Sequence, residues 1–213
     1  MSNNKLPYLF YDNYVTDKYE DQLDYFLSWT LRCTEKKYEN INNKVNKYAK
    51  IILSKILFND ENHLQNVDIL SVKCGKYCNI NIGYIDLWTE FEIKGHEKKY
   101  VIIFENKGCT LIRNGQLEKY QEYIDNYYHG KNCIIKYILL RGSDNILPDD
   151  YLKCKNTKFI PVCIKDIMEI LKNNEKTGNE LFDEFWFNWF LDIETYKSMY
   201  NGINGINDIF GLS

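Results

Sequence analysis

An unbroken run of apolar residues, residues 100–104, ends in a carboxylate at Glu105, and this run constrains the fold more than any other part of the sequence. The middle of the run is β-branched, so it favours a strand over a helix. A strand without alternating polar residues is buried on both faces, as in the centre of a sheet covered by helices. An ionised carboxylate at the end of such a strand is costly unless it is paired or binds a cation. The sequence therefore predicts a central strand with a chemically specialised end.

The patterns on either side of this strand predict the order helix, helix, three strands, helix, strand, strand, helices. This order is typical of an α/β fold with a mixed β-sheet flanked by α-helices. No linker rich in Pro, Gly or Ser and no repeat is present, so one domain over residues 1–213 is the simplest organisation. We expect its core at residues 67–164, with helical N- and C-terminal extensions. Apolar spacing predicts helices at residues 17–33, 41–58, 116–128, 165–173 and 179–200, and strands at residues 67–72, 80–88, 100–105, 134–140 and 159–163.

Turn and loop residues complete this outline. Residues 94–99 contain Gly95 between two strand patterns and predict a hairpin turn. Residues 143–150 carry Pro148 and are expected to form a loop. Pro161 lies inside the last predicted strand, where a missing N–H favours a place at the edge of the sheet.

Length and charge exclude several classes of protein. The chain has 213 residues, a formal net charge of −3 and 45% hydrophobic residues, values that suit a globular protein with a buried core. No apolar stretch approaches the roughly 20 residues that span a bilayer, and the first residues do not resemble a signal peptide. We therefore expect no membrane partner and a cytoplasmic location. The net charge disfavours a protein coated in nucleic acid but leaves room for a local basic surface.

The cysteines predict reduced thiols. There are seven of them, an odd number, and without a secretion signal a disulfide framework is not expected. Cys74 and Cys78 form an isolated CxxxC pair, whereas a structural zinc site needs two further ligands. Zinc is therefore the less favoured alternative to buried, reduced cysteines.

Two carboxylates stand where neighbouring strands should meet. Asp86 lies in the predicted strand before the hairpin turn, and Glu105 ends the strand after it. If these strands are hairpin neighbours, the two carboxylates lie side by side and repel each other, and a divalent cation relieves that repulsion. Oxygen ligands of this kind favour Mg²⁺ or Mn²⁺ over zinc.

Lys107 completes the constellation. It lies two residues beyond Glu105, so on a strand both side chains point to the same face. An ammonium there could orient an attacking water and stabilise charge on a phosphate. Either half of the pattern alone is more often an ordinary surface or turn feature. Their order, strand context and shared face favour a site that hydrolyses phosphodiester bonds.

Three segments together resemble the PD-(D/E)XK nuclease superfamily. They are residues 83–87 (Gly-Tyr-Ile-Asp-Leu), residues 102–107 (Ile-Ile-Phe-Glu-Asn-Lys) and residues 116–120 (Gln-Leu-Glu-Lys-Tyr). The resemblance covers residues 67–141 best and departs from the family pattern at Ile85, where proline is common. It implies a restriction-endonuclease-like mixed sheet between helices. It also implies a catalytic role for Lys107.

The same resemblance implies further site residues. Asp86 and Glu105 would bind Mg²⁺, with the backbone carbonyl of Asn106 as an additional ligand. Many relatives carry a glutamate on the first core helix that completes the metal shell, and Glu20 is the best match here. Glu20 is equally well explained as an acidic residue favoured at a helix start. Residues 19–29 are also similar to the opening helix of an uncharacterised, defence-associated branch of the superfamily.

Gln116 and Tyr120 lie one turn apart on the same predicted helix face. We favour an interpretation in which Gln116 faces the site and touches phosphate or a water held by the metal. In the alternative, Gln116 is a surface residue and Tyr120 belongs to the core. Four basic residues near the predicted site are candidates for phosphate contacts, although scattered surface charge explains each of them as well: Arg113, Lys119, Lys131 and Arg141.

The segment at residues 181–190 is unusually aromatic. Base stacking is one use of such side chains. A helix that is apolar nearly all round is more often buried, so we favour the core or a homodimer contact.

Together these patterns predict a Mg²⁺-dependent nuclease that acts on nucleic acid, with DNA favoured. Restriction, phage defence or a mobile element would be a fitting setting. The main alternative is a catalytically silent nucleic-acid-binding or regulatory module with the same fold. A purely structural protein assembled through the aromatic segment is a second alternative.

Overall fold

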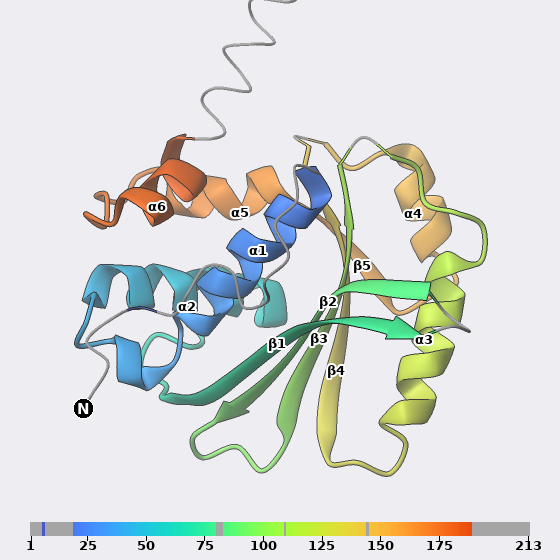
Figure 1. The fold of residues 1–213 in the computed structure, drawn as a ribbon, viewed down its shortest axis with the longest axis horizontal. Helices are drawn as coiled ribbons and strands as arrows, with labels where there is room; N and C mark the ends of the chain where they lie inside the picture. Colours follow the sequence, from blue (N-terminus) through green and yellow to red (C-terminus); the bar gives the residue numbers. More distant parts are fainter. Residues whose placement is uncertain (1–5, 7–18, 80–82, 109, 144, 189–213) are drawn as a thin grey trace, which may run out of the picture.

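A five-stranded mixed sheet lies at the centre of the computed structural model (Figure 1), which describes residue 6 and residues 19–79, 83–108, 110–143 and 145–188. The strands follow the order β1-β2-β3-β4-β5, with antiparallel pairing from β1 to β3 and parallel pairing from β3 to β5. This arrangement confirms the expected α/β fold. The strands are β1 Ile69–Asn79, β2 Gly83–Ile93, β3 Lys99–Lys107, β4 Cys133–Arg141 and β5 Phe159–Cys163.

Strand β3 is the central strand that the apolar run predicts. Every residue from Tyr100 to Asn106 is buried, and β2 and β4 flank it on either side. Strand β5, which contains Pro161, lies at the edge of the sheet, also as predicted. Strand β1 continues to Asn79 and β2 continues to Ile93, beyond the ends at residues 72 and 88 that their sequence patterns suggest, and the expected strand residues 80–82 lie outside the described ones.

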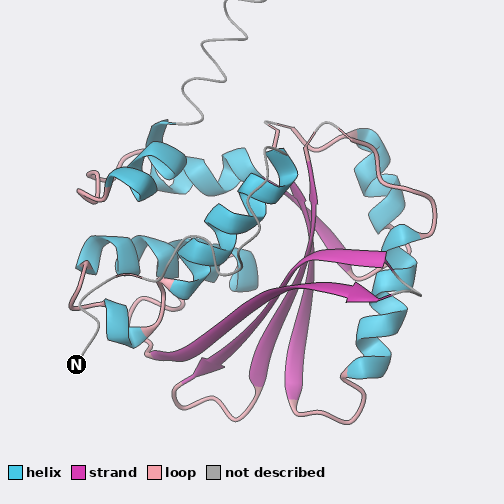
Figure 2. Ribbon diagram, viewed as in Figure 1, coloured by secondary structure: helices cyan, strands magenta, loops and turns pink. Residues whose placement is uncertain are grey.

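Helices cover both faces of the sheet (Figure 2). Helices α1, α2, α5 and α6 lie against one face, and α3 and α4 lie against the other (Figure 1). The helices are α1 Tyr19–Arg32, α2 Asn43–Phe58, α3 Gln116–Tyr127, α4 Pro148–Cys154, α5 Ile164–Leu171 and α6 Glu180–Asp183, with a 3₁₀ turn at Lys36–Tyr38 and a π-helical turn at Glu184–Asn188.

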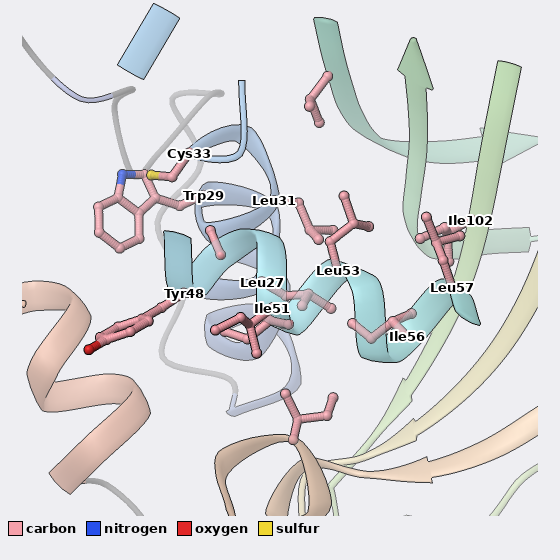
Figure 3. Packing of buried hydrophobic residues seen from close by; sticks show 14 of the residues in the cluster. Leu27, Trp29, Leu31, Cys33, Tyr48, Ile51, Leu53, Ile56, Leu57 and Ile102 are labelled. Carbon is pink, nitrogen blue, oxygen red and sulfur yellow. The ribbon is translucent and has the colours of Figure 1, made fainter. Parts of the chain in front are cut away.

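Each face of the sheet has its own apolar cluster. The larger cluster fills the space between the sheet and α1, α2, α5 and α6. In Figure 3, Leu57 of α2 lies beside Ile102 of β3, and Leu53 of α2 lies next to Leu31 of α1. The smaller cluster joins β2, β3 and β4 to α3 and includes Val101 and Ile103. Helices outside residues 67–164 therefore supply much of the larger cluster. A single domain over residues 1–213 stays a prediction.

The aromatic C-terminal segment belongs to the larger cluster as far as it is described. Phe182, Phe185 and Trp186 are buried, the Phe185 ring stacks on Phe26 with centroids 4.3 Å apart, and the Trp186 indole N–H donates to Thr30 Oγ1 at 2.8 Å. This agrees with a core role for these rings rather than base stacking. The expected long helix over residues 179–200 is α6 followed by the π-helical turn up to Asn188, and its remaining residues lie outside the described ones.

The sequence interpretation was wrong about residues 143–150. The last three of these residues are not loop, because α4 begins at Pro148. Proline is tolerated at the first position of a helix, where its missing N–H would have no helical partner. Asp150 then accepts a hydrogen bond from the Leu147 N–H at 2.9 Å and caps the helix start.

A β-bulge interrupts β2 at Asp86. The register between β1 and β2 shifts between Gly75 and Tyr77, so two residues of β2, Asp86 and Leu87, lie opposite one residue of β1. Residues two apart on a regular strand share a face, yet Ile85 packs in the smaller cluster and Leu87 packs in the larger one. The bulge therefore changes the phase of the strand at Asp86.

Five described cysteines are free thiols: Cys33, Cys74, Cys133, Cys154 and Cys163. Burial raises the pKa of the Cys74 thiol to about 12, which is the behaviour of an inert core cysteine. Among the described helices, none combines the length and the apolar character that crossing a membrane requires.

Candidate active site

Strands β2 and β3 hold the two predicted carboxylates next to each other. The last pair in the register between these strands is Leu87 with Phe104, and one step further along both strands Asp86 comes beside Glu105. The backbone N–H of Asn106 donates to Asp86 Oδ2 at 2.8 Å and ties the strands together at this point. The hairpin and the bulge thus direct both carboxylates to the α3 face of the sheet.

Glu105 is a buried carboxylate with one oxygen satisfied and one not. Only 1% of Glu105 is exposed. The Lys107 ammonium lies 2.5 Å from Oε1, and the Gln116 amide donates to the same oxygen at 2.5 Å. Among the described residues, Oε2 has no hydrogen-bond partner. Burial, followed by repulsion from Asp86, raises the pKa of Glu105 to about 8, although the Lys107 ammonium acts in the opposite direction.

Gln116 is brought to this carboxylate by the start of α3. The preceding residue, Gly115, has φ 72°, a left-handed conformation that glycine adopts without strain and that turns the chain into the helix. The Gln116 amide also donates to the Tyr120 hydroxyl at 3.1 Å, and that hydroxyl donates to the Tyr84 carbonyl at 2.5 Å. The chain of bonds fixes Gln116 between α3, β2 and Glu105, whereas Tyr120 is buried in the smaller cluster.

These side chains line one open cleft of about 490 Å³. Asp86, Glu105, Lys107 and Gln116 lie together along it. Its rim comes from the start of β2, the loop after β3 and the first turns of α3. The rim includes two exposed aromatic or apolar side chains and two of the expected basic ones: Tyr84, Leu111, Arg113 and Lys119.

The other two basic candidates lie elsewhere. Arg141 is fully buried and donates to both oxygens of Asp150, at 2.7 and 2.5 Å, and to the carbonyls of Gly108 and Thr110, at 3.2 and 2.6 Å. Its prediction as a phosphate contact was therefore wrong, because all of its donors serve the protein itself. Lys131 follows the C-terminal end of α3, whereas the cleft lies at the N-terminal end of that helix.

Asn106 turns its side chain away from the cleft. It is fully buried, and its amide donates to Asp24 of α1 on the opposite face of the sheet. The backbone of Asn106 still contributes to the cleft, because its N–H donates to Asp86. The role of its carbonyl as a metal ligand stays a prediction.

Asp24 is the acidic residue that the sequence interpretation missed. It is 1% exposed, and the Lys76 ammonium lies 3.0 Å from its Oδ2. Burial, followed by repulsion from Asp86, raises the pKa of Asp24 to about 7, and Lys76 opposes that shift. The sequence signal was its position between Leu23 and Leu27 on the apolar side of α1, where an acid is unexpected. Glu20 begins the same helix, but its side chain lies outside the described residues.

The residues present fit a hard divalent cation. Two carboxylates share one cleft, and a buried oxygen of Glu105 receives no hydrogen bond from the part of the chain that the structure describes. A nearby cation would stabilise this oxygen. Carboxylate oxygens are hard ligands, which Mg²⁺ and Mn²⁺ prefer. Within the described ranges, no group of three or more His, Cys, Asp or Glu side chains has the arrangement of a metal site. A cation here would therefore draw on the two carboxylates together with backbone oxygens and water.

Comparison with known proteins agrees with the motifs. A search of curated proteins and of solved structures finds no match to the chain. The family model described as PD-(D/E)XK nuclease superfamily matches residues 10–187, which include β1 to β5 and every residue of the cleft. With that match over most of its length, the chain belongs to the PD-(D/E)XK nuclease superfamily.

Proposed function

We propose that this protein is a metal-dependent nuclease that hydrolyses phosphodiester bonds, with DNA as the favoured substrate. The Glu105 carboxylate carries the proposal: it is buried beside Asp86 and Lys107, and its Oε2 has no partner among the described residues, yet it lines an open cleft. A carboxylate in that setting is unfavourable until a cation lies close to it. Membership of a nuclease superfamily supports the same chemistry.

Asp86 and Glu105 would hold Mg²⁺, or Mn²⁺, with their carboxylate oxygens. The Asn106 carbonyl and Glu20 are further predicted ligands. When bound, the cation supplies Lewis-acid activation of water and offsets negative charge on the phosphate. The Asn106 N–H keeps Asp86 oriented for this task, because it already occupies one of the two carboxylate oxygens.

Lys107 connects the carboxylates to the substrate. Its ammonium lies 2.5 Å from Glu105 Oε1, and 12% of its side chain remains exposed at the cleft. From this place it can donate to an attacking water or to a phosphate oxygen and stabilise the charge that develops there. Its positive charge also opposes the effect of burial on the pKa of Glu105 and so favours the ionised, ligating form.

Gln116 and the basic rim would orient the substrate. The Gln116 amide holds Glu105 Oε1, and its position at the cleft allows contact with phosphate or with water. Arg113 and Lys119 are exposed on the same rim, where phosphate contacts would fix the position of the nucleic-acid backbone. None of these contacts reads sequence, so no recognised site is proposed.

Cleavage by a matched set of variants tests the proposal. Plasmid and oligonucleotide DNA are incubated with wild type, Asp86→Asn and the control Tyr151→Phe on α4, each with Mg²⁺, Mn²⁺ or EDTA. We expect cleavage by wild type and the control only when a metal is present, and loss of cleavage in Asp86→Asn. Equal cutting by wild type and Asp86→Asn would show that the activity comes from a contaminant.

The alternative is a silent module that binds nucleic acid without cutting it. Calorimetry with Mn²⁺ separates the two, because a nuclease site binds the ion in wild type and loses it in Asp86→Asn. Nucleic-acid binding with neither Mn²⁺ binding nor cleavage would favour the silent module.

Other expectations stay predictions. They are a homodimer through the aromatic C-terminal helix, a cytoplasmic location, and a setting in restriction, phage defence or a mobile element. Within the described residues, Phe182, Phe185 and Trp186 of that helix are already buried in the larger cluster, so a dimer contact would need other side chains of the helix.

A further inference from the structure

A second recess opens on the same face of the sheet, next to the cleft. It encloses about 310 Å³, and we call it the aromatic recess. Two aromatic side chains dominate it, Trp88 of β2 and Tyr127 of α3, and Tyr127 is 46% exposed. The remaining lining that matters here comes from β1 and β2: Lys73, Gly75, Lys76 and Glu90.

The aromatic recess continues the cleft along the same two elements. On β2, Trp88 follows Asp86 by two residues, a separation of about 7 Å on a strand. On α3, Tyr127 follows Tyr120 by seven residues, about 10 Å along the helix axis. In Figure 1 the end of β1 and the start of β2 extend towards α3. Cleft and recess share β2 and α3, with β3 added at the cleft and β1 added at the recess. A polymer whose phosphate occupies the cleft would pass over the recess.

The rings of the aromatic recess are held in place. Trp88 meets Tyr127 edge to face, with centroids 5.2 Å apart and planes at 87°. The Trp88 indole N–H donates to the Tyr128 hydroxyl at 2.8 Å, and that hydroxyl donates to Glu90 at 2.5 Å. The polar edge of Trp88 is therefore anchored inside the protein. The same bonds engage the carboxylate of Glu90, which is the acidic side chain of the recess lining.

Gly75 keeps the side of the Trp88 ring uncovered. The two residues are directly opposite in the register of β1 and β2, so a side chain at residue 75 would stand beside the indole. A Cβ built at Gly75 meets no atom within 4 Å. Glycine is disfavoured in a strand interior, and it often marks a place where a ligand approaches closely.

Lysines surround the aromatic recess. Lys73 lines it from β1, and the Lys131 ammonium lies 3.5 Å from the centroid of the Tyr127 ring. Lys76 also borders the recess, but its ammonium is paired with Asp24 of α1. Lys119 stands on the rim of the neighbouring cleft. Aromatic faces interleaved with ammonium groups are the usual composition of a surface for unpaired nucleic acid, in which bases stack and the backbone is neutralised.

We propose that the aromatic recess stacks an unpaired base of the substrate, so that the enzyme acts on single strands or on unpaired ends. This inference deepens the proposed function and depends on it for the phosphate in the cleft. A base within a duplex has both faces covered by its neighbours, so an indole can stack only on a base that has left the duplex. The geometry thus favours a single strand that runs from the cleft over Trp88 towards Lys131.

Binding without cleavage tests the inference. Anisotropy in EDTA measures the affinity for fluorescein-labelled oligothymidylate of about 12 nucleotides, oligouridylate of the same length and a blunt DNA duplex. Trp88→Leu removes the ring, Trp88→Phe keeps a stacking face, and Gly75→Val fills the recess without touching an aromatic residue. Tyr151→Ala, on the exposed side of α4, is the control, because Tyr151 is 57% exposed and lies outside both cavities.

We expect Trp88→Leu and Gly75→Val to weaken single-strand binding about five- to tenfold, the loss of one stacked base, and to weaken duplex binding less. Trp88→Phe should recover most of the affinity, and Tyr151→Ala should match wild type. Urea unfolding of each variant confirms that the fold is intact. The comparison of thymidylate with uridylate tells DNA from RNA.

Equal single-strand affinities in all variants overturn the inference, and so does a wild type that binds no oligonucleotide. Equal losses for single strand and duplex overturn it as well. Binding that depends on Trp88 without any metal-dependent cleavage keeps the stacking surface and removes the nuclease. Cleavage with binding that ignores Trp88 does the reverse, so the two proposals fail separately.

Discussion

Two buried ion pairs lie side by side at the ends of neighbouring strands, and they are built differently. Lys107 of β3 and Arg141 of β4 are partners in the parallel register. Arg141 and Asp150 are 1% and 0% exposed, and they meet through two hydrogen bonds while Arg141 also serves two backbone carbonyls. Glu105 is equally buried, but among the described residues its Oε2 lacks a partner.

The difference is the one expected between a structural pair and the proposed functional pair. The Arg141–Asp150 pair fixes the loop after β3, through Gly108 and Thr110, and satisfies the polar groups that it buries. The Glu105–Lys107 pair lies beside a second carboxylate, Asp86. Glu105 Oε2, which has no hydrogen-bond partner among the described residues, leaves room for an additional positive charge. The well-satisfied Arg141–Asp150 pair thus stabilises the structure next to the less well satisfied Glu105–Lys107 pair.

Removal of the arginine should have the largest effect. Arg141→Met leaves Asp150 buried without its partner, and the free energy of unfolding should fall by about 3–5 kcal/mol. Urea denaturation measures this loss. The double variant Arg141→Met/Asp150→Leu should recover much of it, because no charge remains buried. A loss under about 1 kcal/mol in the single variant would contradict the structural role of the pair.

Removal of the lysine should affect chemistry more than stability. We expect Lys107→Met to cut about 10²- to 10³-fold more slowly, the usual cost of one charge-stabilising donor. Its free energy of unfolding should change little, because Glu105 can take up a proton once the ammonium is gone. Single-turnover cleavage with Mg²⁺, beside urea denaturation, tests both halves. A large stability loss with an unchanged rate would make Lys107 the structural partner instead.

The third prediction concerns pH. Burial raises the pKa of Glu105 in the folded protein to about 8, above roughly 4.3 in the unfolded chain. The folded protein therefore binds this proton more tightly, and the stability it contributes is complete below pH about 4 and is lost as pH rises towards 8. In EDTA, Glu105→Gln should be more stable than wild type by a margin that grows from pH 5 to 8. A margin independent of pH would refute the assigned shift.

The smallest effect is expected at an exposed pair with a similar distance between its charged atoms. Lys158 lies 2.7 Å from Asp125, but their side chains are 59% and 33% exposed. Lys158→Met should lower the free energy of unfolding by less than about 1 kcal/mol, and salt should reduce that difference further. A cost like that of Arg141→Met would mean that distance, and not burial, decides the strength of these pairs.

Much of the fold and the centre of the site could be predicted from the sequence. The apolar run predicted the central place of β3. The expected hairpin predicted that Asp86, Glu105 and Lys107 lie close together, and the structure places them in one cleft. These predictions succeed because strand alternation and hairpin pairing are local and periodic. Gln116 joins them because one helical turn is also a fixed spacing.

The parts that the sequence could not give depend on contacts between distant segments. Asp24 meets Asn106 and Lys76 only after α1 packs on the sheet, so the family pattern drew attention to Glu20 instead. Arg141 looked like a surface cation, because its partner Asp150 stood in a segment interpreted as loop. No periodicity reports such partners, since each is set by the tertiary packing of two elements.

The bulge in β2 also has a consequence for how this site can vary. Side chains before it and after it occupy their proper faces only because the strand carries one extra residue at Asp86. Deleting one residue here would exchange inside for outside over residues 83–85 while leaving the strand beyond Leu87 in place. Chain length at this point is therefore constrained in its own right, and residues 83–85 should tolerate apolar or conservative substitutions where an insertion or deletion beside Asp86 is not tolerated.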